Sequence, residues 1–449
     1  MNEETMTVEE VKALLETTRK GFPSNSIDNC LTVFRSDPML KGAIKRNCLT
    51  GRTDIVKELG WSRESATLTD TDMKYLLLHF EKNYGLTSEK KIMSAMSIIA
   101  NENRYHPIRD YLNRLKWDGV ERIRFALHRY LGADISDFTY ECLKLFMLGA
   151  IKRVFYPGSK FEMMLCLVGG QGAGKSTFFR FLAVNDEWFS DDLKKLDDEN
   201  VYRKLEGHWI IEMSEMIATA NARSIEEIKS FISRQKETYK VPYETYPADR
   251  PRQCVFGGTT NKQDFLPKDR TGNRRFLPVR VHAEEAEAHL LDDEESSRAY
   301  IDQMWAEAME IFRSGKYSLK LPKKIADHLK EYQLDFMQED TQAGQVYAWL
   351  DDFSGDKVCS KMIYREALGN GFKEPADWET RAICEIMNTG IDNGDLVGWK
   401  KFTSPTKIGE YGKQKGWERV PVNGNQDVNR VENQQMEFVE LSDDEDLPF

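Results

Sequence analysis

A glycine-rich segment is the clearest sign of chemistry in this sequence. In LVGGQGAGKSTFF, Gly169 is followed after four residues by Gly174, Lys175 and Ser176. Glycines let backbone N–H groups turn onto phosphate oxygens, and a following helix adds its positive N-terminal end. The lysine of this pattern reaches the β- and γ-phosphates of ATP, and the serine ligates Mg²⁺. We predict a nucleotide-binding loop formed by Gly169, Gly170, Gln171, Gly172, Ala173, Gly174, Lys175, Ser176 and Thr177.

Two glutamates follow the apolar run Trp209-Ile210-Ile211, which is typical of a buried strand. A phosphate-binding loop needs an acid at the end of a neighbouring strand. We therefore expect Glu212 to join Ser176 around Mg²⁺ and Glu215 to polarise the attacking water, although the two roles are exchangeable. The alternative is that both acids are solvated loop residues.

Later motifs add candidates for the same reaction. Asn261 ends the apolar run QCVFGGTTN, where its amide would hold the attacking water, although Thr-Asn after a strand is also ordinary turn chemistry. Arg274 and Arg275 precede the strand-like run FLPVRV, where an arginine finger would meet the nucleotide of a neighbouring subunit. A surface basic pair is the alternative for these arginines.

A basic and aromatic hairpin is predicted between the acid and asparagine motifs. TYKVPYE and RPRQCVF resemble two strands joined by the turn TYPAD. Bases stack on aromatic rings at about 1–3 kcal/mol each while cations follow the phosphates, which suits single-stranded DNA. A structural hairpin with inward-facing tyrosines is the alternative. The candidate DNA contacts are Lys240, Tyr243, Tyr246, Arg250 and Arg252.

Hydrophobic spacing predicts how these motifs are positioned. Apolar residues recur at helical spacing before position 160, whereas short apolar runs alternate with helical segments from Phe161 onward. We expect an α/β P-loop fold of the AAA+ type, with an all-α N-terminal domain and a small C-terminal domain for which a winged helix is one candidate. The expected divisions are a helical oligomerisation domain at 1–100, a helical lead-in at 101–160, the ATPase domain at 161–340, the C-terminal domain at 341–420 and a linker with an acidic tail at 421–449.

Composition limits the location and the partners of the chain. The formal net charge is −11, but fourteen acids lie in residues 284–295 and in the tail from Glu432 onward, so a local DNA-binding surface remains possible. The seven cysteines form no close pairs, which suits a reducing cytoplasm. The sequence has no long apolar run and no signal-peptide pattern, so we expect a cytoplasmic protein without a membrane partner.

The order of these motifs resembles the virulence-associated protein E family. The resemblance runs from YHPIRDYLNRLKWDG to RRFLPVRV and includes FISRQKETYKVPYE and NKQDFLPKDRTGNRRF. These proteins look like superfamily III helicases of phages and pathogenicity islands. The resemblance implies a ring, usually a hexamer, with ATP and Mg²⁺ at subunit interfaces and the hairpin in a central channel. Because only about 100 helical residues precede the family core and they carry no acidic metal pair, we expect no primase activity.

Three functions agree with these patterns. The leading hypothesis is an ATP-dependent helicase that acts on single-stranded and forked DNA to replicate a mobile element. The alternatives are a ring ATPase acting on a non-DNA, defence or packaging substrate, and an origin-binding regulator with a vestigial ATP site.

The sequence closes on SDDEDLPF, an acidic run followed by an apolar cluster. It resembles the terminus of bacterial single-stranded DNA-binding proteins and implies recruitment of host replication proteins. The acids would steer toward a basic patch, and the apolar residues would fill a pocket. A solubilising tail and a tail that folds back onto the protein's own channel are the alternatives. The residues concerned are Asp443, Asp444, Glu445, Asp446, Leu447, Pro448 and Phe449.

Overall fold

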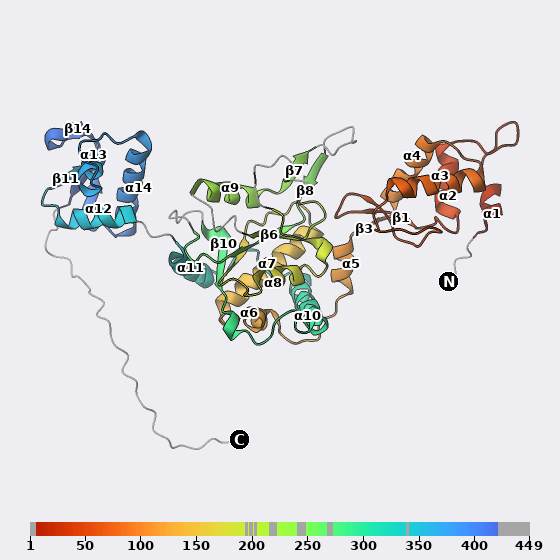
Figure 1. Cartoon of the computed structure of the whole chain (residues 1–449), viewed down its shortest axis with the longest axis horizontal. Helices are drawn as coiled ribbons and strands as arrows, with labels where there is room; N and C mark the ends of the chain where they lie inside the picture. The colour runs from red at the N-terminus through yellow and green to blue at the C-terminus, as the bar shows by residue number, and fades with distance from the viewer. Residues whose placement is uncertain are drawn as a thin grey trace, which may run out of the picture. The chain divides into compact units, whose positions relative to one another are not determined.

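The computed structural model describes residues 6–193, 196, 201, 204–214, 222–239, 248–266, 273–337 and 341–420. The chain forms two compact units, Met1–Glu339 and Asp340–Phe449 (Figure 1). The first unit contains an N-terminal region with its own apolar core and the α/β core that follows it.

The N-terminal region combines helices with a small sheet in the order β2-β1-β3, so the prediction of an all-α domain is wrong. Strands β1, β2 and β3 are four, three and two residues long, which is too short to show the alternating apolar pattern that indicates a strand. Asn47 shapes the turn between β1 and β2, because its side chain accepts a hydrogen bond from the backbone of Leu49. The elements are α1 (Val8–Ala13), α2 (Ile27–Ser36), β1 (Ile44–Asn47), β2 (Thr53–Ile55), α3 (Asp70–Tyr84), α4 (Glu89–Glu102) and β3 (Arg104–Tyr105).

Asp72 fixes the start of α3. Its carboxylate closes a capping box with Thr69 and accepts hydrogen bonds from Trp61 Nε1 at 2.8 Å and Arg63 Nε at 2.9 Å. Burial alone would raise the pKa of Asp72, but the bonds from Trp61, Arg63 and Thr69 outweigh burial and lower the pKa to about 2. The ionised carboxylate therefore stabilises the folded N-terminal region.

Asp72→Asn is expected to loosen α3. The native pKa of about 2 lies below the ordinary value of 3.8, so the contribution is present above pH 4 and is lost as the pH falls toward 2. It is worth on the order of 2 kcal/mol. Hydrogen exchange in the full chain at pH 7 should show α3 amide protection lowered roughly thirtyfold. Asp70 is exposed and lies in the same first turn of α3, so Asp70→Asn should lower the amide protection of α3 only a few-fold. Equal effects of the two substitutions would contradict this role of Asp72.

Three helices lead into the α/β core: α5 (Pro107–Arg114), α6 (Ile123–Leu131) and α7 (Asp137–Phe155). The structure confirms helices in this stretch. It also places α7 against β4 and β9, so the lead-in is part of the α/β core itself. Thirteen of the nineteen residues of α7 are buried, which explains why its sequence lacks a polar face.

The core is a five-stranded parallel sheet in the order β10-β4-β9-β6-β5. Because the strands are parallel, their carboxyl ends share one edge, where Val168 is paired with Thr260 and Ser214 with Thr259. The strands are β4 (Met164–Val168), β5 (Phe189–Ser190), β6 (Ile210–Ser214), β9 (Val255–Thr260) and β10 (Phe276–Arg280). Between or after these strands the chain forms the helices α8 (Lys175–Leu182), α9 (Ala222–Ser233), α10 (Glu294–Arg313) and α11 (Lys323–Tyr332) and the antiparallel pair β7 (Lys236–Tyr239) and β8 (Ala248–Pro251).

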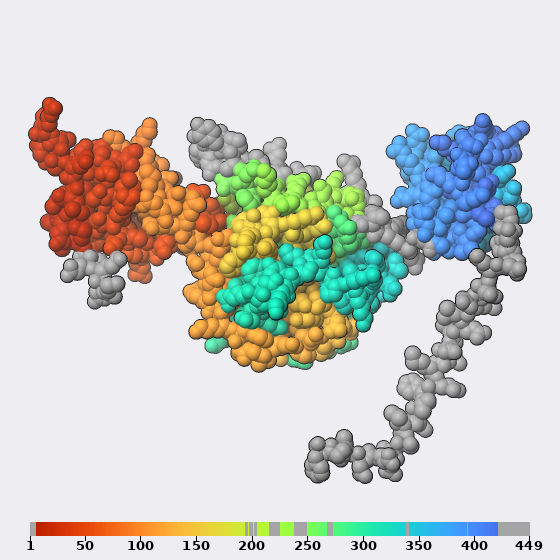
Figure 2. Space-filling model, turned by 180° about the vertical axis from the view of Figure 1, so that it is seen from behind, coloured from red at the N-terminus to blue at the C-terminus, as the bar shows by residue number. Residues whose placement is uncertain are grey.

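Alternate strand residues fill two apolar cores. Leu165 and Leu167 face the cluster that contains α7 and α8, whereas Cys166 and Val168 face the cluster that contains α9. Helix α10 packs against α7 and α8, and Figure 2 shows α10 and α11 (teal) over the preceding orange and yellow segments. The sheet is therefore covered on both faces, as buried parallel strands require.

The second unit begins with a helix, a strand and two further helices, and four short strands follow them. Its main sheet is antiparallel in the order β11-β15-β12, and its own apolar core includes Trp399 and Trp417. The elements are α12 (Thr341–Asp352), β11 (Lys357–Cys359), α13 (Ser360–Met362), α14 (Asp377–Asn393), β12 (Trp399–Lys401), β13 (Thr406–Lys407), β14 (Lys413–Gln414) and β15 (Gly416–Arg419).

Across the described ranges, none of the helices combines the length and apolar content needed to span a membrane.

Candidate functional site

The predicted loop connects β4 to α8 at the carboxyl edge of the sheet, where parallel α/β folds bind ligands. Gly172 and Gly174 have φ angles of +82° and +78°, which other residues adopt only under strain. A Cβ at Gly169 would lie 2.5 Å from the carbonyl oxygen of Val281, so only glycine fits this close approach. The glycine spacing recognised in the sequence is therefore required by the backbone.

Lys175 is the first residue of α8 and is buried. Its ammonium donates hydrogen bonds to the carbonyl oxygens of Gly169 at 2.7 Å and Gly170 at 2.6 Å and to Asn261 Oδ1 at 2.9 Å. Burial lowers the pKa of Lys175, against the opposing effect of nearby Glu212. The structure thus brings the predicted lysine and asparagine together from α8 and from the end of β9.

Glu212 lies inside β6 and is almost completely buried. Its Oε1 accepts hydrogen bonds from Ser176 Oγ at 2.7 Å and from Thr259 Oγ1. Its Oε2 has no hydrogen-bond partner among the described residues, and burial raises the pKa of the carboxyl group. A buried carboxylate oxygen without a partner is costly unless a ligand or water satisfies it.

The strand that carries Glu212 is not the neighbour of β4, contrary to the prediction, because β9 lies between them. Glu212 still reaches Ser176 across β9. A glycine in β9, Gly257, is paired with Glu212, and a Cβ on it would lie 2.5 Å from the ring of Phe179 in α8. This glycine lets α8 pack closely on the sheet, which brings Ser176 within reach of the carboxylate.

The glycine-rich loop, Lys175, Ser176 and Asn261 line an open pocket of about 610 Å³. It includes residues that the sequence did not single out: Thr259 and Thr260 lay inside the quoted motif, and Lys262 follows it. His289 lies in the acidic stretch 284–295, whose sequence shows a charge pattern and no ligand-binding motif. The lining residues are Gln171, Gly172, Ala173, Gly174, Lys175, Ser176, Thr177, Ser214, Thr259, Thr260, Asn261, Lys262 and His289. Glu215 lies outside the described residues.

Arg274 and Arg275 lie at the opposite edge of the sheet from this pocket. They precede β10, whose first residue is paired with Met164 and whose last is paired with Val168. A strand of this length separates its ends by roughly 15 Å. The structure therefore does not bring either arginine to Lys175 within one chain.

The two arginines also differ in their surroundings. Arg275 Nε donates to Ser233 Oγ at 3.1 Å and lies 3.5 Å from Glu162, and its side chain is 20% exposed. The Arg274 side chain is 70% exposed and approaches Glu162 only at 3.8 Å. Arg275 is thus held in place, whereas Arg274 projects from the surface.

The predicted hairpin exists, with different strand bounds. Strands β7 and β8 pair antiparallel with Lys236 opposite Pro251, and the second predicted strand is divided between β8 and β9. Lys240, Tyr243 and Tyr246 lie outside the described residues. Arg250 lies at the base of the hairpin, 3.6 Å from Glu206.

Arg252 was predicted to contact DNA, but the structure places it in the interior. Only 3% of the residue is exposed, and its guanidinium donates to Glu237 Oε1 at 2.7 Å and packs over the rings of Phe231 and Phe256. Residue type alone suggested a surface cation. The apolar rings and Glu237 instead make Arg252 a packing residue beneath the hairpin.

The acidic tail, from Asp443 to Phe449, also lies outside the described residues.

The pocket combines groups that suit a phosphate ligand carrying a divalent cation. Lys175 supplies a cation, Ser176 an exposed hydroxyl, and Glu212 a carboxylate oxygen that is not otherwise bonded. No group of three or more His, Cys, Asp or Glu side chains in the described ranges is placed to hold a metal ion. A cation at this site would therefore need oxygen ligands from its phosphate partner as well.

Comparisons with solved structures find three apo structures of the NrS-1 C-terminal region at 13–14% identity. The first covers 88% of this chain and 100% of that chain, with a TM-score of 0.46. The others cover 84% of this chain and 96% and 95% of theirs, with TM-scores of 0.43 and 0.41. Such low similarity leaves the activity of this chain to be inferred from its own residues.

No curated protein sequence matches the chain. The virulence-associated protein E-like domain matches residues 112–338, which are about half of the 449 residues and contain the whole sheet and the pocket. This chain therefore belongs to the virulence-associated protein E-like family.

Proposed function

We propose that this chain is an ATP-driven DNA helicase that acts as a hexameric ring in the replication of a mobile element. The observation that carries the proposal is that Lys175, Ser176 and Asn261 line one pocket at the carboxyl edge of a parallel sheet, with the buried Glu212 hydrogen-bonded to Ser176. A buried ammonium and a helix N-terminus at the same point favour the phosphates of a nucleotide.

Mg²⁺ fits this pocket because Glu212 Oε2 is buried and has no hydrogen-bond partner among the described residues. Ser176 and Glu212 would hold the ion, which would neutralise phosphate charge during transfer. Asn261 would orient the attacking water, and Glu215 remains our candidate for polarising it. Ionised Glu212 is the form that holds a cation, and a cation in turn would offset the cost of burying that charge.

The position of Arg274 supports the proposed ring assembly. Hydrolysis in this class uses an arginine at the transferred phosphate. The Arg274 side chain is 70% exposed and lies at the edge of the sheet remote from its own pocket. It can meet a nucleotide only in another subunit. Repetition of such a head-to-tail contact closes a ring when the rotation permits.

We infer a DNA-binding role for the second unit, because α12, β11, α13 and α14 precede the strands that complete the β11-β15-β12 sheet, and this arrangement resembles a winged helix. Helix α14 contains four acidic residues and one basic residue, Arg381, so it is poorly suited to lie along phosphates. Exposed lysines lie instead on β12, β13 and β14 and on the connection between β14 and β15. We propose that this part makes the DNA contact, through Lys400, Lys401, Lys407, Lys413 and Lys415.

The test is ATP turnover with and without single-stranded DNA, together with unwinding of a forked duplex. We expect turnover that rises several-fold with an oligo-dT strand, and ATP-dependent strand separation. Turnover that ignores DNA would favour a ring ATPase with another substrate, and absence of turnover would favour a regulator with a vestigial site. Particle size measured in the same preparation shows whether rings are present.

A further inference from the structure

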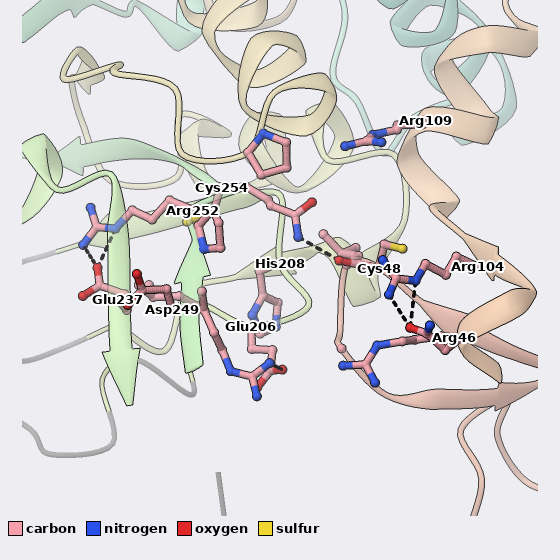
Figure 3. Close-up of a pocket in the computed structure, with 18 residues that line it drawn as sticks. Arg46, Cys48, Arg104, Arg109, Glu206, His208, Glu237, Asp249, Arg252 and Cys254 are labelled. Atoms are coloured by element: carbon pink, nitrogen blue, oxygen red, sulfur yellow. Dashed lines mark hydrogen bonds and ion pairs between the residues drawn. The ribbon is translucent and has the colours of Figure 1, made fainter. Parts of the chain in front are cut away.

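A second cleft, of about 630 Å³, lies where the N-terminal sheet meets the base of the β7–β8 hairpin (Figure 3). Both walls belong to the first compact unit. One wall is formed by the β1–β2 turn, β3 and α5, and the other by β8 and the segments next to β6 and β9. This cleft is separate from the nucleotide pocket and shares none of its lining residues.

The N-terminal wall carries three arginines without acidic partners. Arg46 and Arg104 are register partners on adjacent strands, and Arg109 follows on α5. Arg104 donates to the amide oxygen of Asn101, and Arg109 donates to the carbonyl oxygen of Val154 at 2.8 Å. No carboxylate in the described ranges pairs with any of the three guanidinium groups. Like charges side by side on neighbouring strands are destabilising, and a bound anion would relieve that repulsion.

The opposite wall does not neutralise these arginines, because its acids are already paired. Glu206 lies 3.6 Å from Arg250, Glu237 is hydrogen-bonded to Arg252, and Asp249 pairs with Lys236. Figure 3 shows the Glu237–Arg252 pair on the side of the cleft away from Arg46 and Arg104. The lining as a whole holds five arginines and three acids, so the cleft is electropositive.

Hydrogen bonds between the two walls hold the cleft in shape. Gln253 Nε2 donates to the carbonyl oxygen of Cys48 at 2.8 Å, and Gln253 Oε1 lies 2.7 Å from His106 Nε2. A Cβ at Gly51 would lie 2.9 Å from Glu206 Oε1, so the β1–β2 turn rests directly against the wall that carries Glu206. An anion site that is already shaped in this way loses less entropy on binding.

We propose that this cleft binds the phosphodiester backbone of single-stranded DNA beside the hairpin. Figure 3 shows Arg46, Arg104 and Arg109 spread along one wall instead of converging on one point. Guanidinium groups arranged in a row suit successive phosphates of a strand better than one compact anion. The choice of DNA as the ligand rests on the proposed function, whereas the surplus of positive charge does not.

The experiment compares Arg46→Gln/Arg104→Gln with its parent in a Lys175→Ala background, so that the nucleotide pocket contributes nothing. Binding of a fluorescein-labelled dT oligonucleotide is followed by anisotropy at several salt concentrations, and tripolyphosphate binding by calorimetry. We expect DNA affinity to fall at least tenfold and the slope of log affinity against log salt to fall by about 1 to 1.5. Arg46→Lys/Arg104→Lys should retain most of the affinity.

The matched control is Arg19→Gln/Lys82→Gln, which removes two exposed charges from the same region outside the cleft. It should change DNA affinity less than twofold. DNA binding that falls equally in both double variants overturns the proposal, as does loss of tripolyphosphate binding with DNA binding intact. Arg104→Gln alone, at an exposed position, provides the comparison if the double variant does not fold. Absence of ATP turnover by the wild-type chain would count against the proposed function only, because these comparisons do not use hydrolysis.

Discussion

Lys175→Ala should lower ATP turnover at least a hundredfold. The ammonium is buried at the start of α8 and is directed by two carbonyl oxygens and Asn261, so no other described cation can replace it at that point. Removal of one pre-positioned charged donor from a site that stabilises developing charge typically costs a factor of 10² to 10³. The ratio of wild-type to variant turnover is obtained from initial rates at saturating ATP and Mg²⁺, measured with and without single-stranded DNA.

Lys262→Ala is the matched control for this result. Lys262 lines the same pocket, but its side chain is 42% exposed and lies 3.7 Å from Asp264. The Lys262→Ala substitution should lower ATP turnover only a few-fold. If the two alanine variants turned over ATP at similar rates, the pocket would not be the site of hydrolysis.

Arg274→Ala should abolish turnover in a homogeneous ring, and mixing should restore part of it. An arginine supplied from a neighbouring subunit is worth about 10³ to 10⁵ in rate. A Lys175→Ala subunit has a defective pocket and an intact Arg274, and an Arg274→Ala subunit has the reverse. Where an intact pocket meets an intact arginine across an interface, hydrolysis should resume. Turnover is therefore measured across a series of mixing ratios after subunit exchange.

The control mixture combines Lys175→Ala with Glu212→Gln. Both substitutions damage the same pocket of a chain, so no interface contains a complete site and mixing should restore nothing. Arg275→Ala distinguishes the two arginines. Because Arg275 is held by Ser233 and Glu162, this substitution should mainly loosen local packing. Equal recovery in both mixtures would contradict a site shared between subunits.

The sequence predicted the parts of the pocket that depend on local chemistry. The glycine spacing required positive φ angles and close approaches, and those constraints act within a few residues. Glu212 and Asn261 could be predicted because each directly follows an apolar run in the sequence, although the structure places Glu212 inside β6. The position of β9 between β4 and β6 was missed, because strand order in a parallel sheet is set by long connections and not by any local pattern.

Other misses have the same physical origin. The sequence predicted that Arg252 is a surface cation. In the structure its guanidinium is buried against the rings of Phe231 and Phe256, a contact that no local pattern indicates. The three arginines on the N-terminal wall of the cleft come from β1, β3 and α5, and folding alone brings positions 46, 104 and 109 together. The N-terminal strands were too short for a periodic signal, so their sheet was not predicted.

Strand β9 connects two distant parts of the machinery. Two residues before it begins, Gln253 is bonded to Cys48 of the N-terminal region, and just after it ends Asn261 is bonded to Lys175. The strand is six residues long, roughly 20 Å, and is clamped between β4 and β6. We therefore expect that a displacement of Asn261 on nucleotide binding would be transmitted along this strand to Gln253, and from there to the N-terminal region and the base of the hairpin.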